Sequence, residues 1–152
     1  MGWAKPAILL WSKNVDRKIP ITSTPMFLVY LFPNTMFNYK TIDQSKIEFV
    51  EIAPVSELPT GERLFIEVEG KALVIFNIAG QYFAIGDVCS HDDGPLGDGD
   101  LEGFNIVCPR HGGEFDVQTG KAVQMPAVVD IPAYPVNVID EVLFVGIPKE
   151  AQ

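Results

Sequence analysis

The feature that most constrains this chain is a pair of short Cys/His motifs in the second half of the sequence. Cys89 and His91 are separated by one residue and Cys108 and His111 by two, with sixteen residues between the motifs. These are the only two cysteines and the only two histidines among 152 residues. Because thiolates and neutral imidazoles are ligands for zinc, copper and iron–sulfur clusters, we interpret all four side chains as ligands of one metal site.

Two other interpretations of the same residues stay open at this point. Cys89 and Cys108 could form a disulfide, with both histidines on the surface. A structural zinc site with two thiolates and two imidazoles is the stronger rival, although such sites usually pair cysteine with cysteine and histidine with histidine. Here each motif contributes one residue of each kind. A brown colour in the purified protein would favour an iron–sulfur cluster and exclude zinc.

The order Cys-x-His, a gap of sixteen residues and Cys-x-x-His followed by Gly112 resembles the signature of the Rieske family. The flanking sequences GDVCSHDDGPLGDGDLEG and IVCPRHGGEFDVQTGKAVQMPA resemble the small Rieske ferredoxins that serve bacterial non-haem iron oxygenases. The resemblance implies one [2Fe–2S] cluster, in which two cysteines hold one iron and two histidines hold the other. By position, Cys89 and Cys108 would bind the inner iron, and His91 and His111 the outer iron.

The resemblance also implies supporting roles for residues around the cluster. Gly94, Pro95 and Leu96 would pack over it and exclude water. Gly113 follows the second motif, where high-potential members of the family carry a serine. Pro126, in the sequence QMPAVV, resembles the proline loop that covers the cluster in this family.

A low reduction potential is expected from the same correspondence. High-potential members carry two further cysteines and hydroxyl donors to the cluster sulfurs. The corresponding positions here hold Asp93 or Gly94, Arg110, Gly113 and Phe115, none of which supplies such a group. Hydrogen bonds to cluster sulfur raise the potential and nearby carboxylates lower it, so we predict a midpoint near about −150 mV or somewhat below. Arg110 would either dock a partner or pair with a nearby aspartate.

Composition changes near residue 45. Residues 1–45 hold five basic and two acidic side chains, whereas residues 46–152 hold six and eighteen. We interpret 1–45 as a poorly structured N-terminal extension outside the fold, and 46–152 as a Rieske-type [2Fe–2S] domain. Met26 and Met36 are possible alternative starts, which an intact mass would test. The apolar runs in the extension are too short to cross a bilayer, so no membrane association is expected.

Beyond residue 45 the sequence is typical of short antiparallel strands. Apolar and β-branched residues recur in 63–68, 72–78 and 81–87, with turns expected at Glu69-Gly70 and Ala79-Gly80. We therefore predict an all-β antiparallel sandwich or barrel, with the ligand loops forming a small cluster-binding subdomain at one end. Further turns are expected at Gly103-Phe104, Gln118-Thr119-Gly120 and Asp140-Glu141, and a single helical turn at Val55–Leu58.

The expected function is that of a one-electron carrier, a Rieske ferredoxin between a flavin-containing reductase and a non-haem iron oxygenase. An oxygenase of this family would carry a further mononuclear iron site with two histidines and a carboxylate. Both histidines of this chain are already assigned, so we expect no catalytic activity of its own. Two alternatives are the small subunit of a multi-component reductase resembling nitrite reductase, and an Fe–S protein tied to cluster assembly.

Charge and cysteine use narrow the partners and the compartment. The acidic body, with a net charge of −9 for the whole chain, argues against binding nucleic acid, which requires a basic surface. It suits a carrier that is steered toward basic docking surfaces. With both cysteines assigned to metal, none remains for a disulfide framework, and this favours the reducing environment of the cytoplasm.

Overall fold

The computed structural model describes residues 8–11 and 47–149, and the regular secondary structure within these ranges is all β-strand apart from one three-residue 3-10 helix. The all-β prediction is therefore confirmed. The elements are β1 (Ile8–Trp11), β2 (Ile47–Pro54), η3 (Val55–Glu57), β3 (Arg63–Val68), β4 (Lys71–Ile78), β5 (Gln81–Gly86), β6 (Leu101–Glu102), β7 (Asn105–Val107), β8 (Glu114–Asp116), β9 (Ala122–Gln124), β10 (Ala133–Tyr134), β11 (Val136–Ile139) and β12 (Val142–Pro148).

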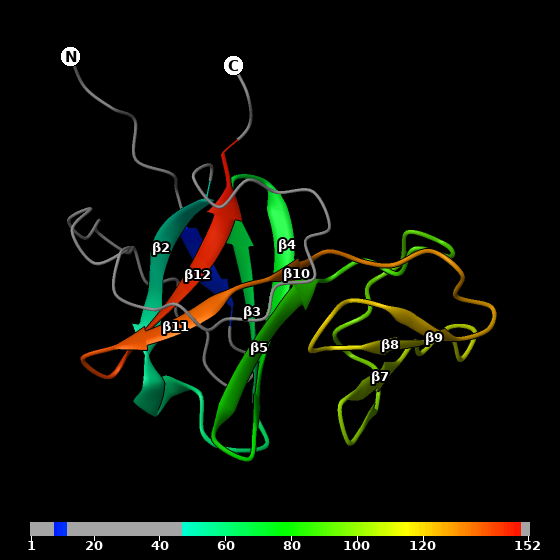
Figure 1. Ribbon diagram of the computed structural model, residues 1–152, viewed down its shortest axis with the longest axis horizontal. Helices are drawn as coiled ribbons and strands as arrows, with labels where there is room; N and C mark the ends of the chain where they lie inside the picture. Colours follow the sequence, from blue (N-terminus) through cyan, green and yellow to red (C-terminus); the bar gives the residue numbers. More distant parts are fainter. Residues whose placement is uncertain (1–7, 12–46, 150–152) are drawn as a thin grey trace.

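The strands form three antiparallel sheets. The largest has the order β1-β3-β4-β5-β10, and a three-stranded sheet has the order β11-β12-β2. A small sheet, β6-β7-β8-β9, lies beside these two and carries the ligand loops (Figure 1). This is the predicted arrangement of a β-sandwich with a subdomain at one end. No helix in the described ranges is long and apolar enough to cross a membrane.

The hairpin turns fall where the sequence places them. Glu69-Gly70 joins β3 to β4 and Asp140-Glu141 joins β11 to β12, and both residues of each pair have positive φ. Positive φ at both central positions is the geometry of the type I′ turn, whose twist matches that of the flanking strands. The helical turn predicted at 55–58 is the 3-10 helix η3.

Strand β4 is buried on both faces and separates two hydrophobic cores. Leu73 and Ile75 belong to an inter-sheet core, whereas Val74 and Phe76 belong to a ligand-side core that also contains both cysteines. A strand covered on both faces needs a continuous apolar run rather than an alternating one, which explains the sequence LVIF at 73–76, where every residue is buried. The other members of the ligand-side core are Ile85, Leu96, Ile106, Phe115, Val117, Ala127 and Ile131.

Two strands differ from the sequence-based expectations. The two-residue strand β10 pairs with β5 and was not predicted, because a pairing this short leaves no period in the sequence. Strand β1 lies within the segment 1–45 that we assigned to an extension outside the fold, yet it pairs with β3 in register Ile8 to Val68. An uncovered β3 would present unpaired N–H and C=O groups, which an extended apolar segment can satisfy. The rest of that assignment, 1–7 and 12–45, lies outside the described residues.

Candidate metal centre

The two Cys/His motifs lie on loops that share one backbone conformation. We call residues 89–94 the first ligand loop and residues 108–113 the second. In each loop the cysteine N–H donates to the carbonyl five residues later, at 2.8 Å in the first loop and 2.7 Å in the second. The residue four positions after each cysteine donates its N–H back to the cysteine carbonyl and has a positive φ, which is 56° at Asp93 and 73° at Gly112. The loops are therefore two copies of one ligand-presenting turn.

The thiols lie on the inner side of the site and the imidazoles on the outer side. Cys89 is 1% exposed and Cys108 2% exposed, and both are free thiols. The rings of His91 and His111 are exposed, with their centroids 4.9 Å apart and an interplanar angle of 71°. All four predicted ligands are thus brought to one place, with sulfur toward the core and nitrogen toward solvent.

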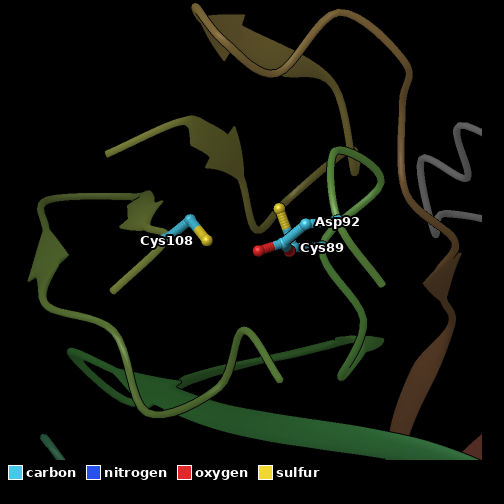
Figure 2. A group of neighbouring side chains, drawn as sticks. All are labelled: Cys89, Asp92 and Cys108. Carbon is cyan, nitrogen blue, oxygen red and sulfur yellow. The ribbon is translucent and has the colours of Figure 1, made fainter. Parts of the chain in front are cut away.

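Asp92 lies among the four side chains. One of its carboxylate oxygens is within 4.8 Å of both sulfur atoms, and one is within 4.8 Å of a nitrogen of each imidazole. Figure 2 shows the carboxylate between Cys89 and Cys108. The Oδ2 atom is buried and accepts no hydrogen bond of normal geometry within the described residues. The nearest cationic group is the Arg110 guanidinium, whose Nε lies 3.1 Å from Oδ2, so the carboxylate is paired with a positive charge among the four side chains.

Two titratable groups in the site are shifted by their surroundings. The N–H of Gly94 donates to Asp92 and holds the pKa of this carboxyl below its ordinary value, and the charge of Arg110 acts in the same direction. Burial raises the pKa of the Cys89 thiol, and the neighbouring Cys108 thiol adds to the effect. Since a thiol must lose its proton to bind a metal, affinity at this site should rise with pH.

The first ligand loop continues into the segment 96–99, whose backbone is hydrogen-bonded by two side chains. Asp87, at the end of the strand that leads to Cys89, accepts hydrogen bonds from the N–H groups of Leu96 and Gly97. Arg63, at the start of β3, donates to the carbonyls of Gly97 and Gly99. Sequence reasoning missed both residues, since an acid after one strand and a base at the start of another are ordinary surface positions.

The segment 125–131 contacts both ligand loops. A Cβ added at Gly113 would lie 3.0 Å from the Cβ of Ala127, so the second loop rests directly on this segment. The Ser90 hydroxyl of the first loop donates to the carbonyl of Val129. Pro126 is half-buried next to Ala127.

The three residues expected to pack over the metal group have different environments. Leu96 is fully buried in the ligand-side core with both cysteines. Gly94 is buried inside the first ligand loop, whereas Pro95 between them is exposed. Pro95 therefore does not share the buried environment of its two neighbours.

The donor set fits a two-iron cluster better than a single zinc ion. Thiolates and imidazoles both bind zinc, but a zinc ion would need all four donors around one point. Here the two sulfur atoms form one close group and the two imidazoles another, with the sulfurs buried and the imidazoles exposed. A group with one metal against the sulfurs and another against the imidazoles matches this separation.

Comparison with known proteins agrees with the geometry. A family model described as "Rieske [2Fe-2S] domain" matches residues 48–135. The chain is similar to the ferredoxin component of the naphthalene 1,2-dioxygenase system of Pseudomonas putida, with 38% identity over 92 residues. The similarity covers 60% of this chain and 88% of that protein.

Solved structures show the same fold. The ferredoxin of carbazole 1,9a-dioxygenase from Nocardioides aromaticivorans IC177 superposes with a TM-score of 0.62 and 31% identity, covering 66% of this chain and 98% of that chain. A structure of the complex of reduced oxygenase and oxidized ferredoxin in carbazole 1,9a-dioxygenase matches with a TM-score of 0.62 and 28% identity. That match covers 68% of this chain and 97% of the other.

Proposed function

Because this chain belongs to the Rieske [2Fe–2S] domain family, we propose that it carries single electrons from a flavin-containing reductase to a non-haem iron oxygenase. The observation that carries the proposal is the pair of matched ligand loops, with buried thiols and exposed imidazoles on one centre. The relatives with this architecture are ferredoxin components of dioxygenase systems. One similar structure contains a ferredoxin bound to its oxygenase.

The four ligands have distinct roles in this proposal. Cys89 and Cys108 hold the inner iron, and His91 and His111 hold the outer iron. When bound, a Rieske cluster accepts and returns one electron, at a potential above that of four-cysteine clusters. The exposed imidazoles give the shortest route between the cluster and solvent, so an electron would leave on their side. Membership of the family removes the zinc and disulfide interpretations.

In this scheme the oxygenase, and not this chain, oxidises the substrate. The two histidines of the whole sequence both lie in the ligand loops, so none is left for a mononuclear iron site of the kind an oxygenase requires. The relatives named above favour this carrier role over a nitrite-reductase-like subunit or a cluster-assembly protein. We place the carrier in the cytoplasm, where thiols stay reduced.

The direct test is electron transfer between purified components. The reconstituted protein should be reduced by a flavoprotein reductase with NADH, and its visible absorbance should recover when the oxygenase and its substrate are added. Reduction without reoxidation by any oxygenase would contradict the proposed acceptor. A protein that holds no iron after anaerobic reconstitution would contradict the cofactor itself.

His111→Cys is expected to lower the midpoint potential by roughly 100 mV, because a thiolate adds negative charge where a neutral imidazole was bound. A redox titration followed by visible absorbance and EPR measures the shift. Asp93→Asn is the control, since it removes a nearby charge without changing a ligand and should raise the midpoint by only tens of mV. An unchanged midpoint in His111→Cys would mean that His111 is not a ligand.

Exposed apolar side chains on the segment that contacts both ligand loops indicate a docking surface. Val128 is 71% exposed and Met125 is 72% exposed, on the segment that contacts both ligand loops. Because such patches usually mark interaction sites, this segment is the proposed contact with the oxygenase. The acidic charge of the domain would add long-range steering toward a basic partner.

Val128→Asp is expected to raise the carrier concentration needed for half-maximal oxygenase turnover by about tenfold, as for loss of an apolar contact in an interface. The midpoint potential should stay within a few tens of mV, because Val128 is not a ligand. Val138→Asp is the matched control, since Val138 is also exposed but lies on β11, in another sheet. Equal effects of the two substitutions would rule out this segment as the docking surface.

A further inference from the structure

The segment 96–99, which follows the first ligand loop, is bound by a cation that comes from the largest sheet. Arg63, at the start of β3, donates from Nη1 to the carbonyl of Gly97 and, at 2.7 Å, to the carbonyl of Gly99. Its guanidinium also lies over the ring of Phe76 on β4, 5.4 Å from the centroid, where cation–π attraction holds it. Arg63 therefore links the sheet to the backbone of the segment.

An anion binds the same segment through its N–H groups. Asp87, which follows β5, accepts hydrogen bonds from the N–H of Leu96, at 2.9 Å, and from the N–H of Gly97. The backbone N–H of Asp87 in turn donates to the carbonyl of Ala72 on β4, at 2.9 Å. Gly97 thus has its N–H bound to a carboxylate and its carbonyl bound to a guanidinium, and hydrogen bonds to charged groups are stronger than neutral ones.

The segment is packed closely against both the sheet and β7. A Cβ added at Gly97 would lie 2.6 Å from Cε1 of Phe65 and 3.1 Å from Cβ of Val74. A Cβ added at Gly99 would lie 1.8 Å from the carbonyl oxygen of Val107. A displacement of the segment is therefore passed on to β7, because the two backbones are in direct contact.

Both cysteines are joined to the contacts of this segment by one or two residues of chain. Cys89 lies two residues after Asp87, and Cys108 directly follows Val107. A shift of the segment therefore changes the separation of the two sulfur atoms, which lie within 4.8 Å of each other. Arg63 and Asp87 bind the segment from outside the groups of side chains that converge at the metal centre, so their hydrogen bonds do not occupy the space of a cluster.

We propose that Arg63 is a positioning residue for the metal centre, which sets the separation of Cys89 and Cys108 by holding the segment 96–99. The inference rests on the proposed function only in assuming that a cluster is bound there. Without the guanidinium, the two carbonyls would bond to water instead, and the segment could take more than one position. The cysteines would then hold the inner iron less uniformly, and local separation of their loops, which costs far less than global unfolding, would occur more often.

Arg63→Met tests this role, because methionine keeps an apolar side chain beside Phe76 and removes both hydrogen bonds to the segment. The reconstituted variant is mixed with an excess of an iron chelator, and the decay of visible absorbance gives the rate of iron release. We expect release about tenfold faster than from the natural protein, the low end of the range for losing a hydrogen bond to a charged group. The EPR lines of the reduced cluster should also broaden, since the variant holds the inner iron in a range of geometries.

Two further variants separate positioning from overall stability. Arg63→Lys should recover part of the natural release rate and line width, because an ammonium group can also donate to two carbonyls. Asn77→Ala is the matched control, since Asn77 is a buried side chain on β4 that bridges the carbonyl of Leu58, at 2.8 Å, and the N–H of Gly80, at 3.0 Å. It should lower the midpoint of thermal unfolding at least as much as Arg63→Met, because buried backbone groups lose their partners, but leave iron release and the EPR spectrum unchanged well below that midpoint.

Three outcomes would overturn this role of Arg63. The first is a natural release rate and EPR spectrum in Arg63→Met, the second is an equal acceleration in Asn77→Ala, and the third is an Arg63→Lys protein as defective as Arg63→Met. If Arg63→Met does not fold, Arg63→Gln takes its place with the same expected results, because its amide is too short to reach both carbonyls. Failure of the electron-transfer test together with the expected release rates would remove the proposed partner and leave the role of Arg63 intact.

Discussion

Cys108→Ala is expected to yield a folded but colourless protein that holds less than about a tenth of the iron of the natural chain. The substitution removes one of two thiolates on the inner side of the site, where Cys108 is 2% exposed. Water cannot readily replace a thiolate there, because the neighbouring side chains of the ligand-side core are apolar, and the nearest other donor, Asp92, offers a carboxylate oxygen, which is a poor substitute for a soft thiolate. Cluster binding depends on every ligand, so the loss should be close to complete.

Iron and sulfide analysis, visible absorbance and far-UV circular dichroism together measure this outcome. The fold should persist, because alanine leaves only a small gap at the edge of the core. Asp93→Asn is the control: Asp93 is exposed on the first ligand loop with φ of 56°, a conformation that asparagine tolerates. It should bind a full complement of iron. A coloured, iron-loaded Cys108→Ala protein would show that Cys108 is not a ligand.

Most of the fold could be predicted because its signals are local. Turn pairs such as Glu69-Gly70 and Asp140-Glu141 lie between apolar segments, and this pattern fixes the hairpins and their register. Strand β10 was not predicted because its two residues are extended only through their pairing with β5, which leaves no pattern in the local sequence. Strand β1 escaped for a related reason, since its pairing with β3 depends on an open sheet edge rather than on its own sequence.

The candidate site, too, has features that the sequence could predict and features that it could not. Its four candidate ligands could be chosen from the sequence because no other cysteine or histidine exists in the chain. The family resemblance already implied an inner pair of cysteines and an outer pair of histidines, and in the structure the thiols are buried and the imidazoles exposed. For Arg110 the sequence left two roles open, and the structure shows the ion pair with Asp92. That pair also offsets one of the carboxylates on which the low-potential prediction relied, so the absence of hydroxyl groups at Gly113 and Phe115 becomes its main support.

Gly99→Ala is expected to be the most damaging single-methyl change near the site. The added Cβ would lie 1.8 Å from the carbonyl oxygen of Val107, a backbone atom that cannot rotate away. At this point the segment that follows the first ligand loop crosses β7, and Arg63 donates to the Gly99 carbonyl at 2.7 Å. Relief of the clash requires the Gly99 segment and β7 to separate, which should lower the free energy of unfolding by about 3 kcal/mol or more.

The same separation would move the second ligand loop, because Cys108 directly follows Val107. We therefore expect Gly99→Ala to lower the midpoint of thermal unfolding by roughly 10–20 °C and to reduce the iron content as well. Gly103→Ala is the matched control on the adjacent β6–β7 turn. There φ is 63° and a Cβ would meet nothing within 4 Å, so only the left-handed conformation is penalised, by about 1–2 kcal/mol.

Circular dichroism melts and iron analysis of both variants separate a steric effect from a conformational one. If Gly103→Ala proves as damaging as Gly99→Ala, backbone conformation rather than close approach limits this part of the subdomain. If Gly99→Ala keeps its iron and its melting temperature, the segment after the first ligand loop and β7 are not in contact as described. The geometry predicts that Gly99 couples the two ligand loops, since a methyl group there would displace both the segment after the first loop and β7, which leads into the second loop.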